Sequence, residues 1–299
     1  MPYLICASFM WAFSYGIIKT KLTVLDPNCV ALCRMAVAFL VFIPFIKYRK
    51  NKELIVQLIF IGAIQYGLMY LLVLKAYQYL DAYQVIFFTA CTPFYVILFN
   101  TIYTRRLTIY HFVVAGLAIL GGGIIYNTQV INENSTAGFF LVQLADICFA
   151  FGQIAYCKMR HNNPEVQDRD ICSLLFLGAI LISIIAITLL GGWGSMQQIT
   201  LQQGLIIIYL GAIPSGLCFF WWNKGATRVH PVVLSVFNNL KLPLATIVSI
   251  VFFHENIKDG VHLIEGVIII MFSLFLANKY QDRKCSSLIG VTNAAKKTI

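Results

Sequence analysis

An internal repeat constrains the fold of this chain more than any other feature. Residues 62–116 align with residues 212–266 at a fixed shift of 150, without a gap. The basic loop residues Arg105 and Arg106 fall on Glu255 and Asn256, so the apolar frame repeats while the loop charges change. This pattern indicates two membrane-embedded halves of inverted topology, an architecture typical of carriers. The matched pairs are Ala76 with Ala226, Pro93 with Pro243, Leu107 with Ile257, and Gly116 with Gly266.

The composition places most of the chain in lipid. Hydrophobic residues make up 60% of it, charged residues 11%, and the mean hydropathy is +0.80. A chain this apolar would expose too much hydrophobic surface to stay dissolved in water. Its net charge of +10 sits in short clusters between the apolar runs, which is the pattern that orients membrane segments and does not indicate nucleic-acid binding. We therefore expect the lipid bilayer and a small-molecule substrate as its partners, and no nucleic acid.

The sequence predicts ten membrane-spanning helices. A helix needs about 20 apolar residues to cross the hydrocarbon core, and only a helix satisfies the backbone of such a segment there. We expect an all-α polytopic membrane protein with ten transmembrane helices in two inverted five-helix repeats, residues 1–130 and 137–279, followed by a basic tail over residues 280–299. The ten apolar runs are residues 3–18, 29–46, 54–74, 82–103, 109–126, 137–157, 171–190, 203–222, 232–253 and 262–278.

Lysines and arginines predict the orientation of these segments. With the N-terminus in the cytoplasm, sixteen of the 22 basic residues fall on the cytoplasmic side and four on the outer side. The remaining two, Arg34 and Lys241, lie within apolar runs. Positive charge is enriched in cytoplasmic loops, so both termini are expected in the cytoplasm. Because each half has five spans, the second half then enters the membrane upside down.

Polar residues within the ninth and sixth runs are candidates for substrate contact. Ionisable groups within the membrane are costly and usually functional. Asp146 lies in the middle of the sixth run, where it could bind a cation or act as a structural partner of Lys241 or Arg34. In the ninth run Asn238, Asn239 and Lys241 precede Pro243, and this proline should release the carbonyl of Asn239 from its helical hydrogen bond. Arg34 is explained by snorkelling or pairing at least as well as by substrate binding.

The matching region of the first half carries further candidates. Prolines at equivalent positions of two repeats point to a binding site at the repeat interface, which makes Pro93 and Pro243 the hinge or pocket prolines. Tyr66 and Tyr70 lie one helical turn apart and could hold a ring or a cation. The candidates from this half are Gln65, Tyr66, Tyr70, Gln84, Thr89 and Thr92.

No residues form a recognisable catalytic or metal-binding set. The five histidines lie near the ends of the predicted spans, without the spacing of metal ligands. There is no glycine-rich loop of the kind that binds nucleotide phosphates. We therefore expect neither an enzyme nor a cofactor or metal, and transport driven by a gradient or by exchange.

Together these features resemble the drug/metabolite transporter superfamily of EamA type. The resemblance extends from Trp11 to about Lys279 and includes ten spans and two inverted five-helix repeats. Four short segments resemble the bacterial uptake branch that includes carriers of biotin and of S-adenosylmethionine. They are Trp11-Ala12-Phe13-Ser14, Gly62-Ala63-Ile64-Gln65, Leu141-Val142-Gln143-Leu144 and Asn238-Asn239. This implies a secondary transporter in the bacterial inner membrane, and it leaves a homodimer open.

The charge of Asp146 favours S-adenosylmethionine within that branch. Biotin is an anion that a buried carboxylate would repel, whereas S-adenosylmethionine carries a sulfonium and an ammonium group against one carboxylate. Asp146 could hold the positive charge, Lys241 the carboxylate, and Tyr66 or Tyr70 the ring or the sulfonium. We therefore expect uptake of S-adenosylmethionine in exchange for S-adenosylhomocysteine. The alternatives are a biotin importer and an amino-acid or amine exporter. A membrane receptor or assembly subunit is less favoured, because the chain has no soluble domain.

Overall fold

The computed structural model describes residues 1–47, 51–125, 135–253 and 260–297, and every regular element within them is helical. The first half contains α1 (Pro2–Lys21), α2 (Pro27–Phe42), α3 (Lys52–Gly62), α4 (Met69–Ala76), α5 (Ala82–Phe88), α6 (Thr92–Thr104) and α7 (Ile109–Ile125). The second contains α8 (Ser135–Asn162), α9 (Asp168–Leu190), α10 (Leu201–Leu210), α11 (Cys218–Ala226), α12 (Pro231–Phe253) and α13 (Gly260–Lys297). Shorter segments are η1 (Ile43–Phe45), η2 (Ala63–Leu68), η3 (Thr89–Cys91), η4 (Trp193–Gln198) and η5 (Gly211–Leu217).

Joined end to end, these elements form ten helical rods within the described residues, at the positions of the ten predicted runs. Four of the short segments continue a rod: η1 extends α2, η2 joins α3 to α4, η3 joins α5 to α6, and η5 joins α10 to α11. Seven helices in the described part of the chain are long and apolar enough to cross a membrane, and α7 is a shorter apolar helix. The rods α1 and α12 are not among these, so ten crossings remain a prediction.

The starts of several rods follow from local sequence. Asp26 accepts hydrogen bonds from the backbone N–H groups of Asn28 and Cys29 and so begins α2. Thr200 and Gln203 form a reciprocal capping box at the start of α10. These side chains satisfy backbone donors that a helix leaves unpaired at its N-terminus. Polar residues between the apolar runs therefore set where these two rods begin.

The third and eighth rods share an irregularity at equivalent positions of the repeat. Each contains a π-helical segment, η2 directly after Gly62 and η5 beginning at Gly211. The residues Ala63-Ile64 and Gly67-Leu68 recur as Ala212-Ile213 and Gly216-Leu217, a shift of 149. The gapless alignment at 150 is therefore wrong by one residue here.

Both of these glycines allow a close helix crossing. A Cβ atom on Gly62 would collide with the backbone of Leu175 in α9, and one on Gly211 would lie 2.9 Å from the carbonyl oxygen of Arg34 in α2. The second and seventh rods are themselves repeat mates. The third rod thus crosses the seventh at Gly62, and the eighth crosses the second at Gly211. These two crossings are equivalent when the halves are exchanged.

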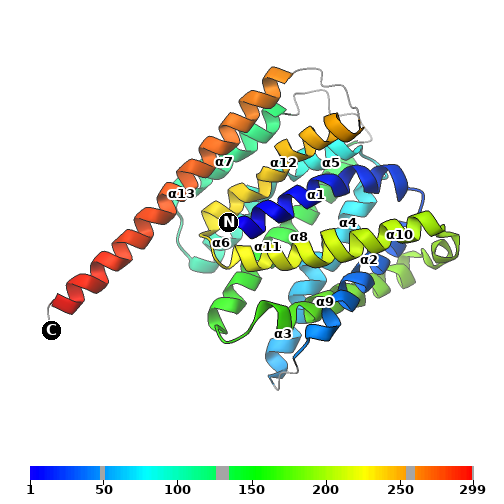
Figure 1. Cartoon of the computed structure of the whole chain (residues 1–299), viewed down its shortest axis with the longest axis horizontal. Helices are drawn as coiled ribbons and strands as arrows, with labels where there is room; N and C mark the ends of the chain where they lie inside the picture. The colour runs from blue at the N-terminus through cyan, green and yellow to red at the C-terminus, as the bar shows by residue number, and fades with distance from the viewer. Residues whose placement is uncertain (48–50, 126–134, 254–259, 298–299) are drawn as a thin grey trace.

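The two halves interlock in a pattern that repeats when they are exchanged (Figure 1). α1 packs on α11 and α12 of the second half, and α8 packs on α4 and α6 of the first. α2 lies against its mate α9, and α7 runs beside its mate α13. Such paired contacts are expected of two repeats related by a two-fold axis. They leave the middle of the molecule lined by both halves.

At the C-terminus the helix is longer than the predicted tenth run. α13 continues to Lys297 and extends away from the bundle at its C-terminal end (Figure 1). Its apolar part spans Val261–Tyr280. Most of the predicted tail over residues 280–299 is therefore helical, and residues 298–299 lie outside the described part.

Candidate functional site

A cavity of about 70 Å³ lies between the halves, which is room for several water molecules. We call it the central cavity. Side chains from α1, α4, α8, α11 and α12 surround it, together with Tyr77 and the η3 residue Thr89. Its remaining lining residues are Trp11, Ser14, Tyr15, Ile18, Met69, Tyr70, Val73, Ala145, Asp146, Phe149, Phe219 and Lys241.

Asp146 on α8 and Lys241 on α12 both line this cavity from the second half of the chain. Asp146 is 4% exposed and Lys241 is 6% exposed. They interact electrostatically, but no direct ion pair joins these two described residues. One carboxylate oxygen of Asp146, Oδ2, is buried without a hydrogen-bond partner. The two groups therefore leave hydrogen-bonding capacity for a molecule in the cavity.

Aromatic rings form one wall of the central cavity. The ring centroid of Trp11 lies 5.1 Å from that of Phe219 and 6.0 Å from that of Phe149, and Tyr70 meets Phe219 edge-on at 5.8 Å. The indole N–H of Trp11 donates to the carbonyl oxygen of Pro214, 2.8 Å away, within the π-helical segment η5. The irregular segment thus fixes the orientation of this wall, which suits a flat or compact apolar ring system.

Arg34 lies behind the cavity wall and is fully buried. Its Nη2 donates to the hydroxyl of Tyr70 at 2.9 Å and to Oγ of Ser215 at 3.0 Å. Its Cζ atom lies 4.4 Å from the centre of the Tyr70 ring. Nε and Nη1 have no hydrogen-bond partner. Arg34 therefore neither snorkels to the membrane surface nor pairs with a carboxylate of any described residue.

Two predicted site residues of the third rod bond to protein groups away from the central cavity. Gln65 Nε2 donates to Oδ1 of Asn223 at 3.2 Å, and Asn223 Nδ2 donates to the Tyr66 hydroxyl at 2.7 Å. The Tyr66 ring stacks on Phe219 at 4.4 Å and on Phe176 at 5.4 Å. Gln65 and Tyr66 do not line the cavity, whereas Tyr70, one turn further along, does.

The predicted asparagines hold helices together. Asn239 Nδ2 donates to the carbonyl oxygens of Ala90 at 3.0 Å and Ala118 at 2.9 Å. Asn238 and Gln153 exchange hydrogen bonds through their side-chain amides at 3.2 and 3.3 Å. Neither asparagine lines the central cavity.

The fourth rod is interrupted before Pro93, and side chains satisfy its freed carbonyl groups. Gln143 Nε2 of α8 donates to Phe88 O at 3.0 Å, and the Thr92 hydroxyl donates to Thr89 O at 2.6 Å. With the bond from Asn239 to Ala90 O, three consecutive carbonyls of this turn are capped. This is how a broken helix is tolerated in a membrane interior.

The remaining predicted residues differ in their surroundings. Thr89 lines the central cavity, and Thr92, whose hydroxyl donates to Thr89 O, lies near Asp146. Gln84 belongs to a capping box with Asp81 at the start of α5, away from the cavity. Pro93 opens α6, while Pro243 lies inside an α12 that continues past it.

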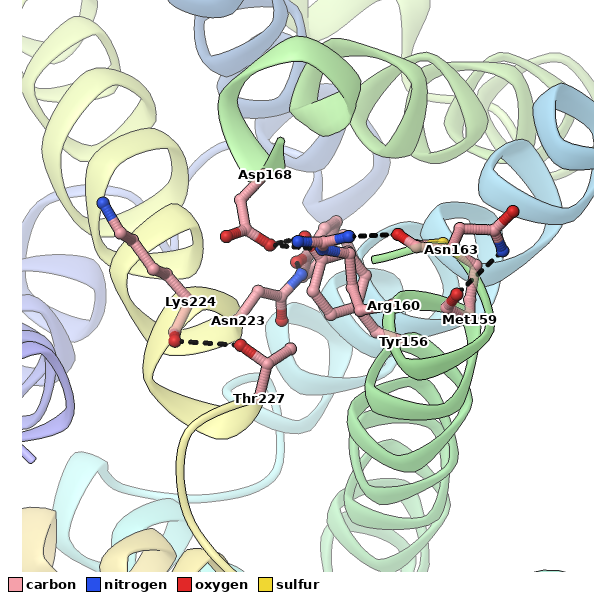
Figure 2. Close-up of polar contacts among 9 residues, drawn as sticks. Tyr156, Met159, Arg160, Asn163, Asp168, Asn223, Lys224 and Thr227 are labelled. Atoms are coloured by element: carbon pink, nitrogen blue, oxygen red, sulfur yellow. Dashed lines mark hydrogen bonds and ion pairs between the residues drawn. The ribbon is translucent and has the colours of Figure 1, made fainter. Parts of the chain in front are cut away.

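A polar network joins α8 to α9 (Figure 2). The Tyr156 hydroxyl donates to Asp168 at 2.6 Å, and Arg160 Nε donates to the same carboxylate oxygen at 3.0 Å. Arg160 Nη1 donates to Asn163 O at 2.6 Å. Tyr156 lies ten residues beyond Asp146 on α8, about 15 Å along the helix. The network ties the end of α8 to the start of α9 well away from the central cavity.

A second contact joins the elements at the other end of the cavity. Lys19 Nζ lies 3.2 Å from an oxygen of Asp81 and donates to Leu80 O at 2.8 Å. Lys19 directly follows Ile18 in the sequence, and Leu80 and Asp81 come shortly after Tyr77. Both Ile18 and Tyr77 line the central cavity. The end of α1 is thereby fastened to the turn between the third and fourth rods.

Several cavity residues carry no individual prediction from the sequence. They include Tyr15, Met69, Tyr77 and Phe149. A signal for the first rod existed, since Trp11, Tyr15 and Ile18 recur at positions i, i+4 and i+7 and so share one helix face. In a segment that is apolar all round, this face does not stand out.

Comparisons with known proteins agree on one family. The EamA-like transporter family matches residues 1–127 and again residues 136–279. The chain is 36% identical over 283 residues to a protein named biotin transporter from Escherichia coli (strain K12), covering 94% of this chain and 93% of that protein. It is 33% identical to a biotin transporter of Salmonella typhimurium, with the same coverage, and 32% identical to a probable biotin transporter of Pseudomonas aeruginosa, covering 92% of this chain and 96% of that protein.

One solved crystal structure has the same fold. It matches with a TM-score of 0.70 at 15% identity, covering 92% of this chain and 98% of that chain.

Proposed function

We propose that this chain, which belongs to the EamA-like transporter family of secondary transporters, takes up biotin across the bacterial inner membrane. The names of its relatives from Escherichia coli and Salmonella typhimurium support this substrate, since both are called biotin transporters. Both termini in the cytoplasm and ten crossings in two inverted halves are parts of the same proposal.

The observation that carries the proposal is the sum of buried charges at the central cavity. Asp146 and Lys241 formally cancel, and Arg34 adds one positive charge that no described carboxylate balances. Arginine stays protonated in proteins. Protonation of Asp146 would add positive charge, and loss of a proton from Lys241 would bring the sum only to zero. A site that is never negative favours an anion, and biotin is a monoanion at neutral pH.

This sum also weakens the case for S-adenosylmethionine. The expectation of S-adenosylmethionine rests on Asp146 and Lys241 alone, with Arg34 open to snorkelling, pairing or substrate binding. S-adenosylmethionine carries two positive charges and one negative charge, so its binding would leave two net positive charges in a low-dielectric site. Buried charge without a counter-charge is strongly unfavourable. Biotin would bring the same site to neutrality.

The chemistry of biotin also matches the residues around the central cavity. Its cyclic urea presents two N–H donors and one carbonyl acceptor, and its fused rings are compact and apolar. The free Oδ2 of Asp146 accepts hydrogen bonds, and the ammonium group of Lys241 donates them. The rings of Trp11, Phe149 and Phe219 offer an apolar surface for the fused rings.

Growth of a biotin-requiring bacterium tests the function. A strain that can neither synthesise nor import biotin should grow on nanomolar biotin when it expresses this protein, and should not grow with the empty vector. Failure to grow, with the protein present in the membrane at normal abundance, would overturn the proposal.

A further inference from the structure

Arg34 has more hydrogen-bond donors than the protein uses. A guanidinium group carries five N–H bonds, one on Nε and two on each Nη. The two on Nη2 reach Tyr70 and Ser215, whereas Nε and Nη1 have no partner. Three N–H donors of a fully buried cation are therefore unused. Charged groups buried in this way are normally satisfied by an acceptor or an opposite charge.

Tyr77 adds a fourth unused donor beside the same cavity. Its side chain is 2% exposed, it lines the central cavity, and its hydroxyl has no hydrogen-bond partner. Arg34 and Tyr77 lie close enough for a charge on one to influence the other. Tyr77 also follows Tyr70 by seven residues, two helical turns, so the two phenols lie on the same side of the third rod. A group of donors without an acceptor is complementary to an anion.

We propose that Arg34 and Tyr77 form an anion subsite that binds the carboxylate of the substrate, while Asp146 and Lys241 hold its uncharged polar end. This inference rests on the proposed biotin transport. It assigns an orientation to the substrate, with the urea between α8 and α12 and the carboxylate against α2 and the end of α4. Asp146 and Lys241 then match the urea of the ligand, and Arg34 matches its carboxylate.

Tyr70 controls access to this subsite. It lines the central cavity, whereas Arg34 does not, and its ring covers the guanidinium group at 4.4 Å. Its hydroxyl also accepts a hydrogen bond from Nη2 of Arg34. The carboxylate reaches Arg34 when the Tyr70 side chain turns aside and gives up this hydrogen bond. A carboxylate is the better acceptor, because hydrogen bonds between two charged groups are stronger than those to a neutral hydroxyl.

Binding of biotin and of its neutral amide tests the subsite. Purified protein in lipid nanodiscs is titrated with biotin and with biotinamide, which retains the urea and the rings and lacks the negative charge. We expect the wild type to prefer biotin. Tyr77→Phe and Arg34→Gln should each weaken biotin binding by about 10- to 100-fold, the range for a hydrogen bond to a charged group. Binding of biotinamide should change by less than about threefold.

Two controls keep the outcome interpretable. Tyr79→Phe removes the same oxygen from a tyrosine that is 43% exposed and lies two residues away, and it should bind both ligands like the wild type. Tyr77→Phe changes one atom, so it decides the question if Arg34→Gln does not fold.

Three results would overturn the inference in different ways. Equal loss of biotin and biotinamide binding in Tyr77→Phe would give Tyr77 a structural role only. Biotinamide binding that requires chloride, measured against gluconate at constant ionic strength, would place an inorganic anion at Arg34. A wild type that binds neither ligand would contradict the proposed function itself.

Discussion

Arg34 and Asp146 determine which substrate the central cavity favours. In the sequence, Asp146 lies in the middle of a predicted span, and its carboxylate predicts a cationic substrate. In the structure Asp146 shares the cavity with Lys241, while Arg34 is fully buried and bonds only to hydroxyl groups. The third charge could not be assigned from the sequence, because a snorkelling arginine and a buried one have the same local pattern.

Replacement of Asp146 by asparagine tests its role as a hydrogen-bond acceptor for the substrate. An amide has one acceptor oxygen where the carboxylate has two, and its bonds to N–H donors are weaker. We expect Asp146→Asn to raise the KM for biotin uptake by about tenfold or more. Biotinamide binding should fall by at least as much, because both ligands carry the urea and only biotin gains from the more positive site. Unchanged biotin uptake by a variant of normal abundance would exclude this contact.

The ten predicted apolar runs coincide with the helical rods, but the sequence did not predict which polar residue faces the cavity. Asn239 and Lys241 are two residues apart, about 200° around the helix. Lys241 lines the cavity, while Asn239 bonds to Ala90 and Ala118 on the other side. In a segment apolar on all faces, hydrophobic periodicity does not fix the rotation of the helix about its own axis. Packing against the neighbouring rods fixes that rotation.

Removal of the Asn239 side chain distinguishes a structural role from substrate contact. Asn239→Ala leaves two buried carbonyl oxygens without this donor, at about 1–3 kcal/mol of stability for each group left unsatisfied. We expect a lower Tm in detergent, with the biotin affinity of the folded protein unchanged. Asn162→Ala, at an exposed helix end, is the matched control. A variant of normal Tm that has lost biotin binding would restore the substrate-contact hypothesis.

Glycine substitutions test the close crossings of the repeat. Gly62→Ala would place a methyl group against the backbone of Leu175, so α3 and α9 would have to separate. Gly123→Ala meets nothing within 4 Å. We expect Gly62→Ala to lower the Tm strongly, since added volume in a close-packed contact costs about 1–3 kcal/mol or more. Gly123→Ala should retain the wild-type Tm. Equal values for the two variants would contradict the crossing geometry.

At the scale of the whole molecule, two related halves meet around the central cavity. The family matches the chain twice, and the helix contacts of one half recur in the other. The sequence predicted this duplication because apolar frames are retained when individual side chains change. The sequence did not predict the exact register of the repeat. The two halves are offset by 149 residues at the π-helical segments and by 150 at the prolines, and a change of one residue leaves the apolar pattern almost unaltered.

The predicted topology places both chain ends in the cytoplasm. A reporter active only in the cytoplasm, fused after Lys284, should be active, and one active only outside should be silent. The reason is the excess of basic residues on that side of the predicted spans. The reverse result would contradict an even number of crossings with a cytoplasmic N-terminus.

Uptake by purified protein in liposomes tests the central claim most directly. Liposomes containing the protein receive radiolabelled biotin or radiolabelled S-adenosylmethionine at equal concentration, with protein-free liposomes as the control. The positive sum of buried charges predicts that biotin accumulates, that excess unlabelled biotin blocks this uptake, and that S-adenosylmethionine neither enters nor competes. Accumulation of S-adenosylmethionine in liposomes that ignore biotin would contradict the account.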